Sequence, residues 1–343
     1  MQREIKSETI LLDEQGNVAM PGWAKKSHYI YDRKMIKAGK LRIKEWDYYC
    51  VLSSEYGLAL TVADNGYMAF YAVTLLDFIN KTETSGTVMT PFSLGKLELP
   101  PSSAEGDIII SEKSMNISIV HKGSARLLRV NYPGFGKGQG LEAEIELEQN
   151  PDDERMVIAT PFEKNGHFYF NEKHNCLPAR GQVKSGDFSY TFGEGSFGVL
   201  DWGRGVWTYK NTWYWGSASG EVAGAPFGFN IGYGFGDTSA ATENMIFYNG
   251  RAHKLNDVVF NIPFGDDGKE RFADPWTFSS SDGRFELDFV PIIDRFSDAN
   301  VLLIRSSQHQ VFGYFSGRVI LDDGSELQIK NLLGFAEKVY NRW

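Results

Sequence analysis

An alternation of apolar and charged residues near the middle of the chain constrains its fold more than any other feature. Between residues 141 and 148 the odd positions are apolar and the even positions are glutamate: Leu141, Glu142, Ala143, Glu144, Ile145, Glu146, Leu147 and Glu148. These residue types would suit a helix, but a period of two puts every apolar side chain on one face of a β-strand. Shorter segments at 115–119 and 285–289 repeat the pattern. We therefore expect antiparallel strands with one buried face.

Turn signals support the same prediction. Asn-Gly or Asp-Gly pairs occur at 65–66, 165–166, 249–250, 267–268, 282–283 and 323–324, and these residues tolerate the positive φ angles of tight hairpin turns. Only residues 24–39 and the last ten residues resemble amphipathic helices. The predicted fold is mainly β, with two antiparallel β-barrel-like units packed together.

The length of 343 residues fits about two domains. A strand that begins at Trp46 resembles one that begins at Trp213, and residues 140–147 resemble residues 316–322 at a similar offset. We interpret this as two copies of one β unit, with chance similarity between β-meanders as the alternative. The polar, turn-prone residues 150–155 then divide the chain into an N-terminal domain, 1–155, and a C-terminal domain, 156–343.

Charge and composition exclude several classes of protein. The net charge of −9 argues against a nucleic-acid binder or a binder of anionic membranes. The longest apolar stretch, 67–76, is half the length of a transmembrane helix, and the N-terminus has no apolar signal region, so we expect a cytoplasmic protein. Two cysteines, Cys50 and Cys176, allow at most one disulfide. The oligomeric state stays open.

Two motifs resemble cofactor sites but lack the context that such sites need. Residues 193–198 fit the dinucleotide pattern G-x-G-x-x-G, yet no helical sequence follows to direct its N-terminal amides at a pyrophosphate. His167, His174 and Cys176 are close in sequence, but their spacing is not that of a zinc site. We therefore expect neither a metal nor a cofactor.

The strongest candidate for a functional site is rich in glycine and tryptophan. Residues 201–216 set polar groups among aromatic rings, and glycine weakens a strand unless a ligand or another backbone comes close. Asp201 and Arg204 lie three apart across Gly203, so we expect them to form a buried ion pair at a turn. Asp201, Arg204 and Glu243 are the predicted catalytic residues, because burial among aromatic rings tunes carboxyl groups for acid–base work.

The predicted substrate-binding residues come from the same segment and from residues 230–248: Trp202, Trp207, Tyr209, Trp213, Trp215, Asn230, Asp237 and Asn244. Two further trios with strand alternation are weaker candidates for the cavity wall: His167, Tyr169 and Asn171, and Gln310, Phe312 and Tyr314. The structural alternative is a polar cluster that pins a β corner, with Arg204 binding loop carbonyls. An aromatic wall with a few polar groups is typical of a small-molecule site.

These segments also carry a resemblance to a known family. The strings DWGRGVWTYKNTWYWGSASG, NIGYGFGDTSAATENMIFYNG and QVFGYFSGRVILDDG resemble the family called domain of unknown function 2804, from residues 21–23 to the C-terminus. The family name implies no activity. The β-rich pattern is more distantly similar to the tandem lipocalin-like fold of carotenoid 1,2-hydratases, which hydrate or cyclise apolar polyenes by acid chemistry. That similarity implies a fold, and no catalytic residue is transferred from it.

Three functional hypotheses follow. The first is a cofactor-independent, acid-catalysed hydratase, isomerase or cyclase that acts on an apolar or part-apolar small molecule, with Asp201 or Glu243 as the acid. The second is a non-catalytic binding protein for a lipid-like or glycosidic ligand. The third is a carbohydrate-active enzyme, since tryptophan stacks on sugars and paired carboxylates cleave glycosides across an open groove.

Overall fold

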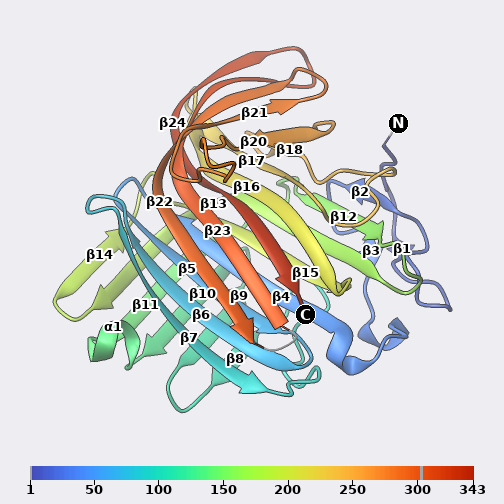
Figure 1. The fold of residues 1–343 in the computed structure, drawn as a ribbon, viewed down its shortest axis with the longest axis horizontal. Coiled ribbons are helices and arrows are strands. Elements are labelled where there is room, and N and C mark those ends of the chain that lie inside the picture. The colour runs from blue at the N-terminus through green and yellow to red at the C-terminus, as the bar shows by residue number, and fades with distance from the viewer. Residues whose placement is uncertain (1, 302–303) are drawn as a thin grey trace.

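The computed structural model describes residues 2–301 and 304–343, and these residues form a nearly all-β protein. Two large antiparallel sheets curl strongly and pack against each other; strands of the first are blue to green in Figure 1, and strands of the second are yellow to red. This confirms the mainly β fold with two barrel-like units. Each unit is an open half-barrel.

The first sheet contains thirteen strands in the order β7-β6-β5-β4-β15-β13-β11-β10-β9-β8, with β12, β2 and β14 beside this path. Its strands are β2 (Gly22–Ala24), β4 (Ile43–Leu52), β5 (Tyr56–Asp64), β6 (Met68–Asp77), β7 (Thr82–Pro91), β8 (Ile108–Ser111), β9 (Asn116–Lys122), β10 (Ala125–Tyr132), β11 (Leu141–Glu148), β12 (Met156–Pro161), β13 (Phe168–Ser185), β14 (Phe188–Phe192) and β15 (Phe197–Val206). The predicted alternation at 141–148 is confirmed, because β11 buries its odd residues and exposes its even ones.

The second sheet contains nine strands in the order β19-β18-β17-β16-β24-β23-β22-β21-β20. They are β16 (Lys210–Val222), β17 (Ala225–Tyr233), β18 (Met245–Tyr248), β19 (Arg251–Lys254), β20 (Val258–Asn261), β21 (Trp276–Ser280), β22 (Phe285–Val301), β23 (Ile304–Ile320) and β24 (Glu326–Arg342). The three last strands are long and form the red and orange meander of Figure 1.

Strand order repeats between the two sheets. In each sheet a four-stranded meander begins with a central strand, β4 or β16, and the last strand of the unit, β15 or β24, pairs beside that central strand. The similarity between the Trp46 and Trp213 segments therefore joins two equivalent strands. The similarity between 140–147 and 316–322 joins β11 to β23, which hold different places in their sheets.

The chain passes from the first sheet to the second between Val206 and Lys210. Strands β12 to β15, which follow the predicted domain boundary at 155/156, pair within the first sheet. The division into domains 1–155 and 156–343 itself stays a prediction.

Helical structure is sparse. The described residues contain the short helices η1 (Arg33–Met35), η2 (Lys40–Arg42) and α1 (Phe135–Gly138), besides the small parallel pair β1 (Thr9–Ile10) and β3 (Tyr29–Ile30). The expectation of helices at 24–39 and in the last ten residues is wrong: the first region holds only η1 and β3, and most of the second continues β24. Within the described chain, no helix is long and apolar enough to cross a membrane.

Three hydrophobic cores result: one inside each curled sheet, and one between the sheets that draws residues from both. The central strand β15 separates the first core from the core between the sheets. Its even residues Trp202 and Arg204 lie with the first core, whereas Asp201 lies with the other, because successive side chains of a strand point to opposite faces. All of β15 is buried.

Arg204 therefore binds partners inside the first sheet. Its Nη1 donates to Asp47 Oδ1 at 3.0 Å, its Nη2 donates to the carbonyl of Pro100 at 2.8 Å, and its guanidinium carbon lies 4.0 Å from the centre of the Trp202 ring. The side chain is fully buried. The expected ion pair between Arg204 and Asp201 is wrong, because an interval of three residues on an extended strand reverses the face.

The Arg204–Asp47 pair yields a stability prediction. We expect Arg204→Ala to lower the free energy of unfolding by about 3–5 kcal/mol, because it leaves the Asp47 carboxyl buried without its ionic partner. Adding Asp47→Asn should recover part of this loss, as measured by urea denaturation. Adding Asp201→Asn instead serves as the control and should give no recovery, and a recovery there would contradict the assignment of faces.

Candidate functional site

Polar and aromatic side chains gather in the core between the two sheets. The first sheet contributes residues from β4, β13 and β15, and the second contributes residues from β16, β17, β23, β24 and the segment before β18. We call this group the inter-sheet cluster; its members are Trp46, Tyr48, Tyr169, Asn171, Lys173, Asp201, Trp213, Trp215, Asn230, Glu243, Gln310 and Glu337. Its four charged residues are all buried.

Asp201 and Lys173 form the ionic centre of the cluster. Lys173 Nζ lies 2.8 Å from Asp201 Oδ1, and Asn171 Nδ2 donates to the same oxygen at 2.6 Å. Trp46 Nε1 donates to the other oxygen, Oδ2, at 3.1 Å. The ammonium of Lys173 also lies 3.9 Å from the centre of the Trp215 ring, a favourable cation–π contact. Asp201 is thus a fully partnered carboxylate facing an aromatic wall.

Glu243 lies on the opposite side of the cluster, in the segment between β17 and β18. Tyr169 donates its hydroxyl to Glu243 Oε2 at 3.0 Å, whereas Oε1 is buried and has no hydrogen-bond partner among the described residues. Asn230 Nδ2 holds the backbone by donating to the Glu243 carbonyl at 2.9 Å. Burial raises the pKa of the Glu243 carboxyl, and the charge of Lys173 lowers it in part.

Glu337 is a third buried carboxyl, contributed by β24. Trp213 Nε1 donates to its Oε1 at 2.9 Å, and Gln310 Nε2 donates to its Oε2 at 3.1 Å. Burial raises the pKa of Glu337 to about 7, against the lowering effects of the Trp213 hydrogen bond and the Lys173 charge. Arg295 orients the Gln310 amide by donating to its Oε1 at 2.7 Å.

Aromatic rings enclose the carboxyl groups. Tyr169 stacks on Phe235 with ring centres 4.7 Å apart and on Trp46 with ring centres 6.3 Å apart. Trp207 packs edge-on against Trp213 at 5.1 Å. A void of about 10 Å³ lies beside residues 197–199 and 217–219, and a depression of about 560 Å³ lies on the outer face of β8 to β11; no residue of the inter-sheet cluster lines either of them.

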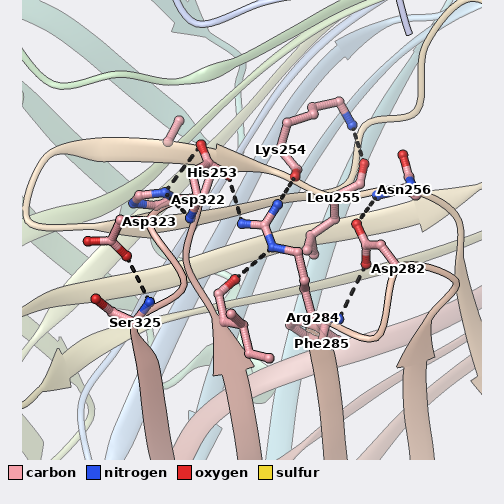
Figure 2. A network of polar contacts seen from close by, with 12 residues as sticks. His253, Lys254, Leu255, Asn256, Asp282, Arg284, Phe285, Asp322, Asp323 and Ser325 are labelled. Atoms are coloured by element: carbon pink, nitrogen blue, oxygen red, sulfur yellow. Dashed lines mark hydrogen bonds and ion pairs between the residues drawn. The ribbon is translucent and has the colours of Figure 1, made fainter. Parts of the chain in front are cut away.

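A polar network anchors the segment that carries Glu243. Lys254 Nζ donates to Thr242 Oγ1 at 2.6 Å and to the Asn244 carbonyl at 2.9 Å, on either side of Glu243. Figure 2 shows how Lys254 is held in turn: Arg284 donates to the Lys254 carbonyl and also binds Asp322. Asn244 fixes the neighbouring strand by accepting from the Gly232 amide at 2.7 Å. These contacts fix the backbone on both sides of the Glu243 carboxyl.

The predicted site residues separate into three groups. The cluster or its aromatic wall contains Asp201, Glu243, Trp207, Trp213, Trp215 and Asn230, with Asn244 directly beside it. Trp202 and Arg204 face the first sheet's core instead. Tyr209 and Asp237 are exposed. The catalytic and binding roles of all these residues stay predictions.

Sequence reasoning missed Lys173 and Glu337 as site residues. Lys173 continues the alternation of Tyr169 and Asn171, which the sequence marked only as weak candidates, and all three face the core between the sheets. Glu337 alternates with Phe335 and Val339, which are both buried. A single charged residue on an otherwise apolar strand face was therefore the sequence signal that could have identified Glu337. Gln310, from the second weak trio, also belongs to the cluster.

The arrangement of charges in the cluster suits proton transfer. Burial favours the neutral form of Glu243 and Glu337, whereas Asp201 is in direct contact with the ammonium of Lys173. Carboxyl groups with separated proton affinities can serve as acid and base. Among the described residues no group of three or more His, Cys, Asp or Glu side chains could hold a metal ion.

The raised pKa of Glu337 predicts a pH-dependent stability. Its pKa rises from 4.5 to about 7 on folding, so the folded protein binds more protons between these values. The free energy of unfolding should therefore fall as pH rises from about 5 to about 8, by up to roughly 3 kcal/mol from this group. Urea denaturation at about pH 5 and at about pH 8 measures this difference in the free energy of unfolding. Glu337→Gln should abolish the difference, whereas Glu142→Gln on the exposed face of β11 should retain it. An unchanged pH profile in Glu337→Gln would contradict the raised pKa.

Comparison with solved structures finds the same overall fold at low sequence identity. Kievitone hydratase from Nectria haematococca is 11% identical, with a TM-score of 0.52 over 97% of this chain and 98% of that one. CghA is 7% identical, with a TM-score of 0.52 over 98% of this chain and 97% of that one. The likeness shows a shared fold, and it supports the predicted two lipocalin-like units.

Comparison with curated protein sequences finds no match. A family of proteins described as "Domain of unknown function (DUF2804)" matches residues 2–343, nearly the whole chain. The predicted resemblance is therefore confirmed, and the chain belongs to the DUF2804 family.

Proposed function

We propose that this protein is an acid-catalysed hydratase, isomerase or cyclase that needs no cofactor and acts on an apolar or part-apolar small molecule at the inter-sheet cluster. The observation that carries the proposal is the buried Glu337 carboxyl, whose pKa of about 7 lets it hold and release a proton near neutrality. It shares one aromatic-walled core with Glu243 and with the Asp201–Lys173 pair.

The three carboxyl groups support separate roles in such a reaction. A protonated Glu243 or Glu337 supplies the proton that adds to a double bond or a carbonyl oxygen of the substrate. Rings of the aromatic wall stabilise the positive charge that develops on carbon, as aromatic rings do for cations. Asp201, whose Oδ1 lies 2.8 Å from Lys173 Nζ, accepts the proton from an attacking water or from the cationic intermediate. Protons are conserved, because one carboxyl loses what the other gains.

The site is closed, which bears on the choice of substrate. The charged residues of the cluster are buried between the sheets, so a substrate enters when ring side chains at the rim move. Trp213 and Trp343 are half-buried there, with ring centres 6.3 Å apart. Enclosed carboxyl groups suit an apolar substrate better than a polysaccharide in an open groove. The fold shared with a protein named kievitone hydratase supports the same reaction class by analogy.

A label-based assay tests the activity across many candidate substrates at once. Purified protein is incubated with a small-molecule extract in water enriched in heavy oxygen, followed by mass spectrometry. Hydration adds one labelled water, whereas isomerisation or cyclisation changes retention at constant mass. We expect the wild type to convert at least one apolar component, and Asp201→Asn and the double variant Glu243→Gln with Glu337→Gln to reduce conversion about 100-fold or more, the range of acid–base catalysis.

Glu142→Gln on the exposed face of β11 is the matched control and should keep full activity. Full conversion by Asp201→Asn and by the double variant Glu243→Gln with Glu337→Gln would place the chemistry elsewhere. A small molecule that copurifies unchanged, with no conversion by the wild type, would favour the non-catalytic binding protein instead.

A further inference from the structure

A second buried polar group lies inside the first sheet, on the opposite face of β13 and β15 from the inter-sheet cluster. Its charged members are three carboxylates and three guanidiniums: Glu45, Asp47, Glu172, Arg126, Arg155 and Arg204. His174 and Ser103 lie among them, and burial lowers the pKa of His174 to about 3, so its ring is neutral. None of these residues takes part in the proposed reaction.

The segment between β7 and β8 closes this interior. Within it, Pro100 offers its carbonyl oxygen to Arg204 Nη2 at 2.8 Å. Ser103 donates its hydroxyl to Glu172 Oε2 and lies 2.9 Å from His174 Nε2. Leu99, Pro100 and Ser103 are buried, whereas Pro101 is exposed, so the segment has an inner and an outer face.

Residues 96–105 have the backbone properties of a movable segment. Glycines with positive φ stand at both ends, Gly95 at 87° and Gly106 at 93°. Glu98 within the segment also adopts a positive φ, of 48°, a conformation that costs free energy in a residue with a Cβ. Within the described chain, the backbone–backbone hydrogen bonds of these ten residues run only to Ser93 and Gly95. Contacts of Leu97, Leu99, Pro100 and Ser103 therefore hold the segment against the interior of the first sheet.

The direction of the hydrogen bonds excludes Ser103 as an activated nucleophile. Arg126 Nε donates to Gln149 Oε1 at 2.9 Å, which fixes the amide so that Gln149 Nε2 donates to His174 Nδ1 at 2.9 Å. The neutral His174 ring then carries its proton on Nε2 and donates it to the Ser103 oxygen. His174 cannot accept the Ser103 proton in this arrangement. Ser103 instead holds the segment to Glu172 and His174 by two hydrogen bonds, which we call the latch.

Hydrogen-bond donors exceed acceptors within this buried polar group. Arg126 Nη2, Arg155 Nε and Trp202 Nε1 are buried and have no hydrogen-bond partner among the described residues. Arg126 and Trp202 are themselves at most 2% exposed. A buried donor without an acceptor costs free energy, and an oxygen-bearing occupant removes that cost.

We propose that residues 96–105 form a lid over a second ligand-binding site inside the first sheet, which takes a small aromatic molecule carrying a carboxylate and a hydroxyl group. The carboxylate would replace the Pro100 carbonyl at Arg204 and meet the unpartnered guanidinium nitrogens. The hydroxyl would replace the Ser103 hydroxyl at Glu172. The ring would pack against Trp202 and Tyr31, whose ring centres lie 6.3 Å apart.

Two serines provide a matched test of the lid. Ser103 and Ser27 both donate a hydroxyl to Glu172 Oε2, but only Ser103 belongs to residues 96–105. We expect Ser103→Ala to raise hydrogen–deuterium exchange in residues 96–105 about tenfold or more, because the latch is lost. Ser27→Ala removes an equivalent hydrogen bond outside the lid and should leave that exchange unchanged.

Binding is measured by calorimetry with 4-hydroxybenzoate as the probe. Ser103→Ala should bind it about tenfold more tightly than the wild type and Ser27→Ala, because a larger fraction of molecules is open. Bound probe should also slow exchange at residues 202–204 of β15. Equal exchange in the two variants would overturn the lid. Absence of saturable binding to Ser103→Ala, or binding without protection of residues 202–204, would overturn the site.

Discussion

The structure depends on charged groups that are buried on both faces of the same strands. β13, β15 and β4 lie side by side at the centre of the first sheet, and each carries ionisable residues on the two sides. A buried charge without a partner is strongly unfavourable, so each face must supply its own counter-charges. Asp201 meets Lys173 on one face, and Arg204 meets Asp47 on the other. Charged residues on opposite faces of the sheet cannot pair with each other, and this constraint keeps two polar centres separate within a single sheet.

The two centres differ in what their charges can do. Between the sheets, Lys173 is in direct contact with Asp201 but not with Glu243 or Glu337, so burial shifts those two carboxyl groups toward the neutral, proton-bearing form. Inside the first sheet, the buried guanidiniums and carboxylates of the polar group are equal in number, and the surplus consists of N–H groups of Arg126, Arg155 and Trp202 that have no hydrogen-bond acceptor among the described residues. The first arrangement favours proton transfer, and the second favours recognition of oxygen atoms.

The sequence predicted the strand content and part of the site because those signals are local. Alternation at 141–148 and the Asn-Gly and Asp-Gly turns depend on neighbours in the chain, and they correctly indicated antiparallel strands. Asp201, Glu243 and the tryptophans of residues 207–215 were found because polar residues among aromatic ones are visible along the chain. The prediction that Arg204 pairs with Asp201 was wrong because it assumed a turn. Both residues lie on the extended strand β15, which puts residues three apart on opposite faces.

The order of residues along the chain is enough to show a β-rich protein that is duplicated in part and has acidic residues near aromatic ones. Composition and the alternation of apolar and polar residues are properties of single segments, so they can be read without the fold. Which acids meet which bases depends instead on the tertiary fold. Lys173 comes from β13, Asp201 from β15 and Glu337 from the last strand, β24, so their proximity requires two sheets packed face to face. The raised proton affinity of Glu337 follows from that packing, because water is excluded from the carboxyl only when both sheets cover it.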